Sequence, residues 1–321
     1  MMRSQIIGVG RGVPARVVEN KEFESFLDTS DEWIRTRTGI SARRVCTHET
    51  ATSLCMESAR GALAQAGIGA EELDLIIVST ITPDTVTPSV ACTIQKMLGA
   101  PRAAAFDISA GCTGFLYAVT VADQFIRSGM YRSVLVVSVD VLSRVTDWSD
   151  RSTCVLFGDG SAAVVLRAGE RGIGNAYIRS DGDLDGSLTI PGNPIDNPWN
   201  HEDARRQTIA MDGRNVFLFA VNHMTDALEH LGQTCPLDEV DWFIPHQANV
   251  RIIELVCKNL GIPREKFYIN IERYGNTSSA SIPIALSEAA EKGLFKTGDR
   301  IALVAFGSGF TWGSMLVEWT L

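Results

Sequence analysis

Segments of continuous apolar residues alternate along the chain with segments whose apolar residues recur at helical spacing. The first kind predicts buried strands at residues 6–10, 73–80, 103–108, 133–140 and within 151–168. The second kind predicts helices at residues 52–67, 89–98 and from near Cys112 to Gly129, each ending at or beside a glycine. This alternation indicates an α/β protein with largely buried sheets.

The pattern of the first half recurs in the second half. Three segments repeat the order of elements of an earlier one: 240–261 matches 73–99, 266–293 matches 103–129, and 300–319 matches 132–166. Internal repeats of this size predict two similar halves, residues 1–172 and 173–321, in a pseudo-two-fold arrangement. Corresponding corners of the two halves would then converge on one site.

Cys112 stands at the corner between a predicted strand and a predicted helix. Unpaired N–H groups at a helix N-terminus stabilise a thiolate, so we expect a lowered pKa for this thiol. Small residues around it leave room for a substrate carbonyl to reach the sulfur. The alternative is a small buried cysteine without chemistry.

His246 and Asn276 occupy the matching corners of the second half. A dyad between the halves would let both face the same cavity as Cys112, at the C-terminal ends of strands, where open α/β sheets bind ligands. Taken singly, His246 fits a buried structural histidine and Asn276 fits an ordinary turn. Their equivalent places in a repeat make the combination more specific.

Composition and charge limit the classes of partner. The chain has 321 residues, 45% of them hydrophobic, enough for one large or two fused domains. A formal net charge of −9 argues against a nucleic-acid partner, and an acidic partner would need a local basic patch. Seven scattered cysteines without a CxxC pair fit a reducing cytosol. With no signal peptide or membrane span expected, we predict a cytoplasmic protein without a membrane partner.

Several motifs around these corners resemble one family. AFDISAGCTGF, IPHQANVRII, RYGNTSSASIP and AFGSGFTWGS, with DTSDEWIRTRTGI near the N-terminus, are similar to the beta-ketoacyl-acyl carrier protein synthase III family. The resemblance runs essentially end to end. It implies a thiolase-like fold, in which two pseudo-symmetric α/β halves form five αβαβα layers, and a homodimer.

The same resemblance implies an activity. A member of this family condenses an acyl-CoA primer with malonyl-acyl carrier protein, with decarboxylation, through an acyl-cysteine intermediate and without a cofactor. By motif, Cys112 is the nucleophile, and His246 and Asn276 stabilise the enolate. The oxyanion hole falls on the backbone N–H groups of Cys112 and Ser308. Glycine is common in the family at the second position, but the donor is backbone either way.

Binding residues also follow from the resemblance. Trp33 and Arg151 would hold the adenine of CoA, and the remaining CoA contacts would be Thr29, Arg37, Gly213, Phe217 and Asn249. An acyl pocket would be formed by Thr87, Leu142, Leu156 and Phe157. Threonine at position 87, where short-chain enzymes often carry an aromatic residue, suggests room for a longer or branched chain.

A basic patch for the carrier protein is predicted at Arg251 and Lys258. These residues lie seven apart on the predicted helix 249–260 and share a face, while we expect Ile252, Ile253, Leu255 and Val256 to point elsewhere. The alternative is an ordinary solvated helix face.

Other classes of function fit this sequence less well. DGDLDG at 181–186 lacks the acidic residue that closes a calcium loop, since Gly192 stands there, and no metal site is expected. A degradative thiolase needs a second cysteine near the C-terminus, and none follows Cys257. A related enzyme of secondary metabolism with another acyl acceptor remains as the alternative. An inactive carrier-binding subunit is disfavoured, because Cys112, His246 and Asn276 are all present.

Overall fold

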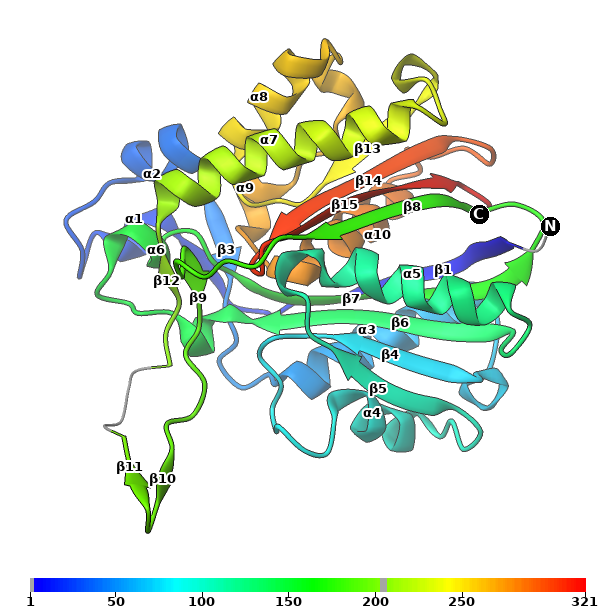
Figure 1. Ribbon diagram of the computed structural model, residues 1–321, viewed down its shortest axis with the longest axis horizontal. Helices are drawn as coiled ribbons and strands as arrows, with labels where there is room; N and C mark the ends of the chain where they lie inside the picture. Colours follow the sequence, from blue (N-terminus) through cyan, green and yellow to red (C-terminus); the bar gives the residue numbers. More distant parts are fainter. Residues whose placement is uncertain (1–2, 203–206) are drawn as a thin grey trace.

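Two mixed sheets form the frame of the computed structural model, which describes residues 3–202 and 207–321 (Figure 1). The first sheet consists of β1 (Arg3–Gly12), β7 (Asp159–Gly169), β6 (Ser133–Val141), β4 (Leu75–Ser79) and β5 (Ala104–Ile108), in that order. The second sheet has the order β13 (Trp242–Pro245), β14 (Arg300–Gly307), β15 (Thr311–Glu318) and β8 (Ile173–Ser180).

The two sheets have equivalent topologies. β6 pairs parallel with β4 and antiparallel with β7, and β14 pairs parallel with β13 and antiparallel with β15. The outer strands β1 and β8 both pair antiparallel with their neighbours. A bridge between Phe243 and Phe267 extends the second sheet at the position that β5 holds in the first. The division proposed at 172/173 falls between the end of β7 and the start of β8.

Helices cover both sheets and fill the space between them. The long helices are α3 (Ala51–Ala66), α4 (Val90–Leu98), α5 (Gly114–Arg127), α7 (Gly213–Gly232), α8 (Val250–Leu260) and α10 (Ser281–Glu291). α3 and α4 pack on the first sheet, α7 and α8 on the second, and α5 and α10 lie between the sheets (Figure 1). The predicted five-layered αβαβα arrangement is confirmed.

The largest apolar cluster lies between the sheets and draws on both halves. It joins Phe115 and Leu116 of α5, Leu286 of α10 and strand residues such as Val136 and Leu303, all nearly inaccessible to solvent. β6 is buried along its whole length because helices cover both of its faces. The two halves therefore share one core, which fixes their corners relative to each other.

Helix ends follow local sequence signals. The side chains of Thr50 and Asn249 accept hydrogen bonds from backbone N–H groups in the first turns of α3 and α8. Both helices end at glycines in the left-handed conformation, Gly67 and Gly261. The cap at Asn249 matters for function, because this residue also lines the cavity described below.

Short elements surround this frame. They are α1 (Asn20–Phe23), α2 (Asp31–Thr38), α6 (Arg151–Cys154), α9 (Ile271–Tyr274), β2 (Val17–Glu19) and β3 (Ala42–Arg44). Among the described residues no helix combines the length and apolar character needed to cross a membrane.

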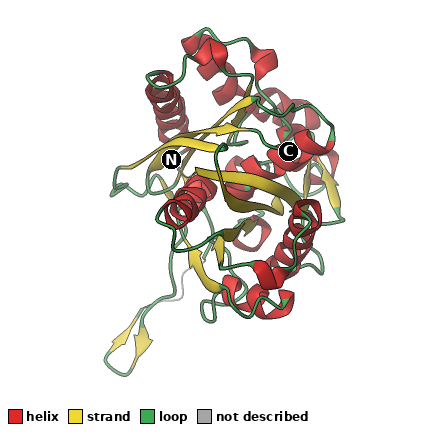
Figure 2. Ribbon diagram, turned by 90° about the vertical axis from the view of Figure 1, so that its right-hand side faces the viewer, coloured by secondary structure: helices red, strands yellow, loops and turns green. Residues whose placement is uncertain are grey.

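A long excursion connects β8 to α7. Within it, β9 (Leu188–Thr189) pairs with β12 (Ala210–Met211), and β10 (Asp196–Asn197) pairs with β11 (Asn200–His201). The β10–β11 hairpin projects away from the layers (Figures 1 and 2). We call residues 186–202 and 207–211 the strap; its base returns to the frame and forms part of a cavity wall.

Candidate active site

A cavity of about 610 Å³ opens where the two sheets meet. Its wall includes residues just beyond the carboxyl ends of β4, β5, β6, β13 and β14, for example Ile81, Ser109 and Leu142. Cys112, His246, Asn276 and Ser308 line this same cavity. Side chains and backbone from both halves thus meet at the point where an α/β sheet presents its ligand site.

Cys112 lies in a single 3₁₀ turn, Gly111–Thr113, between β5 and α5. The end of β14 packs directly on it, since a Cβ on Gly307 would lie 2.7 Å from the Cys112 nitrogen. A Cβ on Gly111 would lie 3.2 Å from the Ser308 nitrogen. Glycine at both positions therefore allows the backbones of Cys112 and Ser308 to approach, which brings both proposed oxyanion-hole donors to one place.

The pKa of Cys112 differs from the sequence expectation. Burial raises the pKa of this thiol to about 12, although the Ser278 hydroxyl and the backbone N–H of Cys112 act in the opposite direction. The prediction of a lowered pKa is therefore wrong for this site. The cavity leaves the residue some exposure, but the surrounding protein desolvates the sulfur more than the helix start stabilises its anion.

His246 follows β13 and is almost wholly buried. Its backbone N–H donates to the carbonyl of Val304 at 2.8 Å. Its ring meets the Phe306 ring edge to face, with centroids 5.3 Å apart. Nδ1 lies 2.7 Å from Oγ of Ser281. Burial lowers the pKa of His246 to about 3, so the imidazole is neutral at pH 7.

The Nε2 atom of His246 is the ring nitrogen left for a substrate. It is buried and has no hydrogen-bond partner in the described part of the chain. Because Nδ1 is engaged by Ser281, only Nε2 can interact with a molecule in the cavity that His246 lines. A buried polar atom without a partner is costly unless a ligand satisfies it.

Asn276 is held by contacts from both halves. Its N–H donates to the Leu156 carbonyl at 2.8 Å, and its own carbonyl accepts from the N–H of Gly158 at 2.9 Å. Gly275 before it has φ +64°, a conformation that favours glycine. The N–H of Ser278 donates to Oδ1 of Asn276 at 2.9 Å, which leaves Nδ2 free for the cavity.

Ser278 is a site residue that the sequence analysis missed. It is 1% exposed, lines the cavity and has φ +51°, which is unusual for a residue other than glycine. The neighbouring Ser279 donates through its hydroxyl to Asp140 at 2.8 Å and so ties the second-half corner to β6 of the first half. Unusual backbone geometry of this kind concentrates at functional sites. No sequence pattern signals a positive φ at a serine.

The apolar end of the cavity contains three of the four predicted acyl-pocket residues, Leu142, Leu156 and Phe157. Thr87 lies outside the wall and is exposed, whereas its neighbour Val86 lines it. The strap residues Leu188, Ile190 and Ile209, which no sequence pattern indicated, pack with Leu142 and Phe157. They come from a segment without clear periodicity, so only the fold reveals their place.

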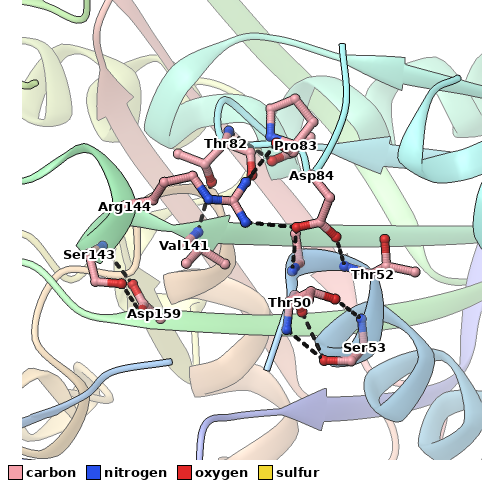
Figure 3. A network of polar contacts seen from close by, with 12 residues as sticks. Thr50, Thr52, Ser53, Thr82, Pro83, Asp84, Val141, Ser143, Arg144 and Asp159 are labelled. Atoms are coloured by element: carbon pink, nitrogen blue, oxygen red, sulfur yellow. Dashed lines mark hydrogen bonds and ion pairs between the residues drawn. The ribbon is translucent and has the colours of Figure 1, made fainter. Parts of the chain in front are cut away.

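Arg144 fixes the loop that forms another part of the wall (Figure 3). Its guanidinium donates to the carbonyls of Thr82 at 3.2 Å and Pro83 at 2.7 Å, and pairs with Asp84 at 2.8 Å. Asp84 accepts N–H groups of Ala51 and Thr52 at the start of α3. The hydrogen bonds from Arg144 and the α3 N-terminus hold the pKa of Asp84 near 2, against the effect of burial.

The predicted CoA residues fall into two groups. Gly213, Phe217 and Asn249 line the cavity, whereas Thr29, Trp33, Arg37 and Arg151 form a separate cluster around α2. The groups are connected, because Nδ2 of Asn249 donates to the Arg37 carbonyl at 3.0 Å.

Trp33 already has two cations on its ring. The guanidinium carbons of Arg37 and Arg151 each lie 5.0 Å from the ring centroid. This separation leaves no space for another ring between Trp33 and Arg151, so Arg151 must move to admit an adenine. Oγ1 of Thr29 is buried without a hydrogen-bond partner among the described residues.

The predicted carrier patch lies on the exposed face of α8. Arg251 and Lys258 are both exposed, and the Arg251 guanidinium carbon is 5.9 Å from the ring centroid of Phe217 at the cavity. Ile252, Ile253 and Val256 are buried and point away from this face, as predicted, and Ile252 lines the cavity. Leu255 does not: it is 37% exposed and shares the outer face with the two cations, because residues three and four apart lie on one side of a helix.

Within the described ranges, no group of three or more His, Cys, Asp or Glu side chains is placed to hold a metal ion.

The five layers and the cysteine at the strand ends define the class of this protein: it is a thiolase-fold condensing enzyme.

Comparison with known proteins narrows the class. Two family models match, "3-Oxoacyl-[acyl-carrier-protein (ACP)] synthase III" over residues 106–182 and its C-terminal counterpart over residues 233–319. A beta-ketoacyl-[acyl-carrier-protein] synthase III of Clostridium acetobutylicum is 47% identical over 320 residues, which cover 98% of each chain. The chain belongs to the 3-oxoacyl-[acyl-carrier-protein] synthase III family.

Solved structures agree with this assignment. The crystal structure of 3-oxoacyl-[acyl-carrier-protein] synthase III from Aquifex aeolicus VF5 superposes with a TM-score of 0.92 at 45% identity, covering 98% of this chain and 100% of that one. A priming beta-ketosynthase from the R1128 polyketide biosynthetic pathway reaches the same TM-score at 36% identity, with 99% and 96% covered.

Proposed function

We propose that the cavity condenses an acyl-CoA primer with malonyl-acyl carrier protein, with loss of CO₂, to give 3-oxoacyl-acyl carrier protein and initiate fatty acid synthesis. The observation that supports this most directly is that Cys112, His246 and Asn276, from opposite halves, line one cavity with Ser308. This set provides a nucleophile, two side-chain donors and a pair of backbone donors.

The first half-reaction acylates Cys112. Its sulfur attacks the thioester carbon of acyl-CoA, the carbon–sulfur bond to CoA breaks, and the thiol proton ends on the departing CoA sulfur. The N–H groups of Cys112 and Ser308 stabilise the intermediate oxyanion. Because burial raises the pKa of Cys112, the sulfur is held mainly as a thiol until a substrate arrives.

The second half-reaction forms the carbon–carbon bond. The malonyl group loses CO₂, and the electron pair of the broken bond is left as an enolate on the thioester. Nε2–H of His246 and Nδ2–H of Asn276 donate to the enolate oxygen in a water-poor site. The enolate carbon attacks the acyl-Cys112 carbonyl, the carbon–sulfur bond to Cys112 breaks, and the departing thiolate takes up a proton from water to regenerate the thiol. This chemistry needs no resident cofactor, because the thioester and the lost CO₂ supply the driving force.

The substrates approach from the α8 side of the cavity. Gly213, Phe217 and Asn249 contact the pantetheine arm, and Trp33, Arg151, Thr29 and Arg37 bind the nucleotide end of CoA. Arg251 and Lys258 meet the acidic carrier protein against an overall charge of −9. The exposed Leu255 between them adds apolar contact.

The protein acts as a homodimer in the cytoplasm. β5 is an edge strand whose outer side has no partner strand in the described chain, and it carries the apolar sequence AAFDI. Beside it, α4 exposes Met97 to 55%. A second copy pairing along β5 would cover both, and light scattering tests the mass. Seven free cysteines fit a reducing compartment.

Mass spectrometry tests the central claim. Incubation with acyl-CoA alone should add one acyl group on the peptide that contains Cys112, and Cys112→Ala should abolish it. Short, branched and long acyl-CoAs are tested in parallel, since the chain preference is open. Absence of the adduct with every chain length would refute the proposal.

A related condensing enzyme of secondary metabolism is the second candidate, favoured by the similarity to the R1128 priming ketosynthase. The two activities share the acyl-enzyme and differ in the acceptor. Rates with malonyl-carrier, malonyl-CoA and hydroxyl acceptors, measured on the preformed acyl-enzyme, distinguish them.

A further inference from the structure

Ser281 is the first residue of α10 and lies directly behind the His246 ring. It is 2% exposed. Its Oγ lies 2.7 Å from Nδ1 of His246 and accepts the N–H of Gln247 at 3.3 Å. These are its side-chain hydrogen bonds in the described part of the chain. The hydroxyl therefore connects the helix between the sheets to the proposed donor of the active site.

The hydrogen-bond donors and acceptors of Ser281, His246 and Gln247 limit where the protons of this contact can lie. A serine hydroxyl has one hydrogen to donate and two lone pairs to accept with, and a neutral imidazole has one N–H and one bare nitrogen. The N–H of Gln247 can only donate, so it takes one lone pair of Ser281. Two arrangements of the Ser281–His246 contact remain.

In the first arrangement the Ser281 hydroxyl donates to bare Nδ1, and the ring proton sits on Nε2. Every buried donor and acceptor of the contact is then used. In the second, Nδ1–H donates to Ser281, whose own hydrogen then has no acceptor among its described contacts. The second arrangement leaves a buried hydroxyl hydrogen unpaired, which costs about 1–3 kcal/mol.

We propose that Ser281 is a positioning residue that holds the ring proton of His246 on Nε2, so that the imidazole presents a hydrogen-bond donor to the cavity. In a histidine the partner of one ring nitrogen decides the protonation of the other. The ring titrates too low to carry a second proton at pH 7, so the tautomer decides whether Nε2 donates. The functional consequence rests on the proposed role of His246 at the enolate oxygen.

Nitrogen NMR of the full-length protein tests the tautomer without any activity assay. The chain has five histidines, so selective ¹⁵N-histidine labelling with the His246→Gln variant assigns the signals. We expect Nε2 of His246 to show a directly bonded proton and Nδ1 to resonate as a bare, hydrogen-bonded nitrogen. A proton on Nδ1 in the unmodified protein would overturn the inference outright.

Variants connect the tautomer to catalysis. Ser281→Ala should shift the Nδ1 resonance toward that of a nitrogen without a hydrogen bond and slow malonyl-carrier decarboxylation by about tenfold or more, since complete removal of an oxyanion donor costs about 10²–10³. Acylation of Cys112 should keep its rate. Ser281→Thr, which retains the hydroxyl, should restore both properties. Ser287→Ala, another buried serine of α10, is the matched control and should change neither.

The outcomes separate this inference from the proposed function. An unchanged Nδ1 resonance and an unchanged decarboxylation rate in Ser281→Ala would show that Ser281 does not position the ring. If instead His246→Gln decarboxylates at the normal rate, the proposed role of His246 fails, while the tautomer remains measurable. Equal slowing of acylation and decarboxylation in a folded Ser281→Ala protein would indicate a general packing role and contradict the inference.

Discussion

The backbone N–H of Ser278 donates to Oδ1 of Asn276 at 2.9 Å, and this contact decides which end of the amide faces the cavity. Oxygen is held at the protein side and the NH₂ group is left to the substrate. The strained backbone of Ser278, with φ +51°, places its N–H for this purpose. A local backbone geometry thus determines the polarity of a site residue.

Asn276→Asp should therefore remove the donor and leave the corner intact, because a carboxylate oxygen can still accept the Ser278 N–H. We expect decarboxylation of malonyl-carrier to fall by about 10²–10³. Acylation of Cys112 from acyl-CoA should keep its rate, and rapid-quench assays of the separate half-reactions check both. Equal losses in the two half-reactions would contradict the assigned role.

The reactivity of Cys112 should rise steadily with pH. With a pKa of about 12, the thiolate fraction grows about tenfold per pH unit from pH 7 to 10 and does not level off there. The rate of alkylation by iodoacetamide, followed on the peptide that contains Cys112, measures how the thiolate fraction changes with pH.

Ser278→Gly extends this test, because glycine tolerates the positive φ and lacks the hydroxyl that lowers the pKa. It should slow alkylation at every pH in this range. Free cysteine, alkylated in the same buffers, is the control for the pH dependence of the reagent itself. A plateau in the Cys112 rate near neutral pH would show that the thiol is already ionised.

Burial of neutral His246 should make the protein sensitive to acid. Its pKa is about 3 in the folded protein against an ordinary value of 6.5, so the unfolded chain binds the extra proton between these values. The contribution of neutral His246 to the free energy of unfolding is fully present above pH 6.5 and is lost as the pH falls toward 3. At about 1.4 kcal/mol per pKa unit, this amounts to a few kcal/mol.

Urea unfolding of the wild-type protein and His246→Gln at several pH values measures this contribution. The difference between the two proteins should diminish or reverse as the pH falls from 6.5, because glutamine takes up no proton. Parallel pH profiles would show that His246 does not contribute.

Arg144 should control acyl-chain selectivity by holding the loop from Thr82 to Asp84 at the cavity wall (Figure 3). Arg144→Met removes these hydrogen bonds and lets the wall relax. The ratio of kcat/KM between the best and the poorest acyl-CoA substrate should fall by about tenfold. This is the size of effect that pocket contacts worth about 1–3 kcal/mol produce. Arg102→Met is the control, because Arg102 also donates to a backbone carbonyl, that of Glu71, away from the cavity.

Reversal of charge at Arg251 should weaken carrier-dependent turnover and spare acylation from CoA. Arg251→Glu places a negative charge where an acidic carrier would dock, so KM for malonyl-carrier should rise by about tenfold and more steeply at low salt. Lys258→Glu should have a smaller effect of the same kind, since it lies farther along α8 from the Phe217 contact. Lys296→Glu, an exposed site outside α8, controls for net charge. Equal loss of both half-reactions in Arg251→Glu would exclude a carrier-specific role.

Part of the candidate site could be predicted from the sequence, because its main residues stand at repeated corners of the chain. Cys112 follows β5 and His246 follows β13, whereas Asn276 follows the short helix α9, and strands of equivalent topology end at the same edge. No such pattern indicated Ser281, Ser278 or the strap. Serines carry no periodic signal, and their roles depend on a hydrogen bond or a backbone angle that exists only after packing.

The sequence by itself determined most of the strands and helices of the frame, though not β8, together with the two-fold repeat and the residues at its corners. Apolar periodicity and glycine stops are local properties, and they act before the chain is packed. Only the tertiary structure decided the chemistry of those residues. Desolvation by the shared core holds Cys112 as a thiol and His246 as a neutral ring, and this effect depends on every surrounding atom rather than on neighbours in sequence.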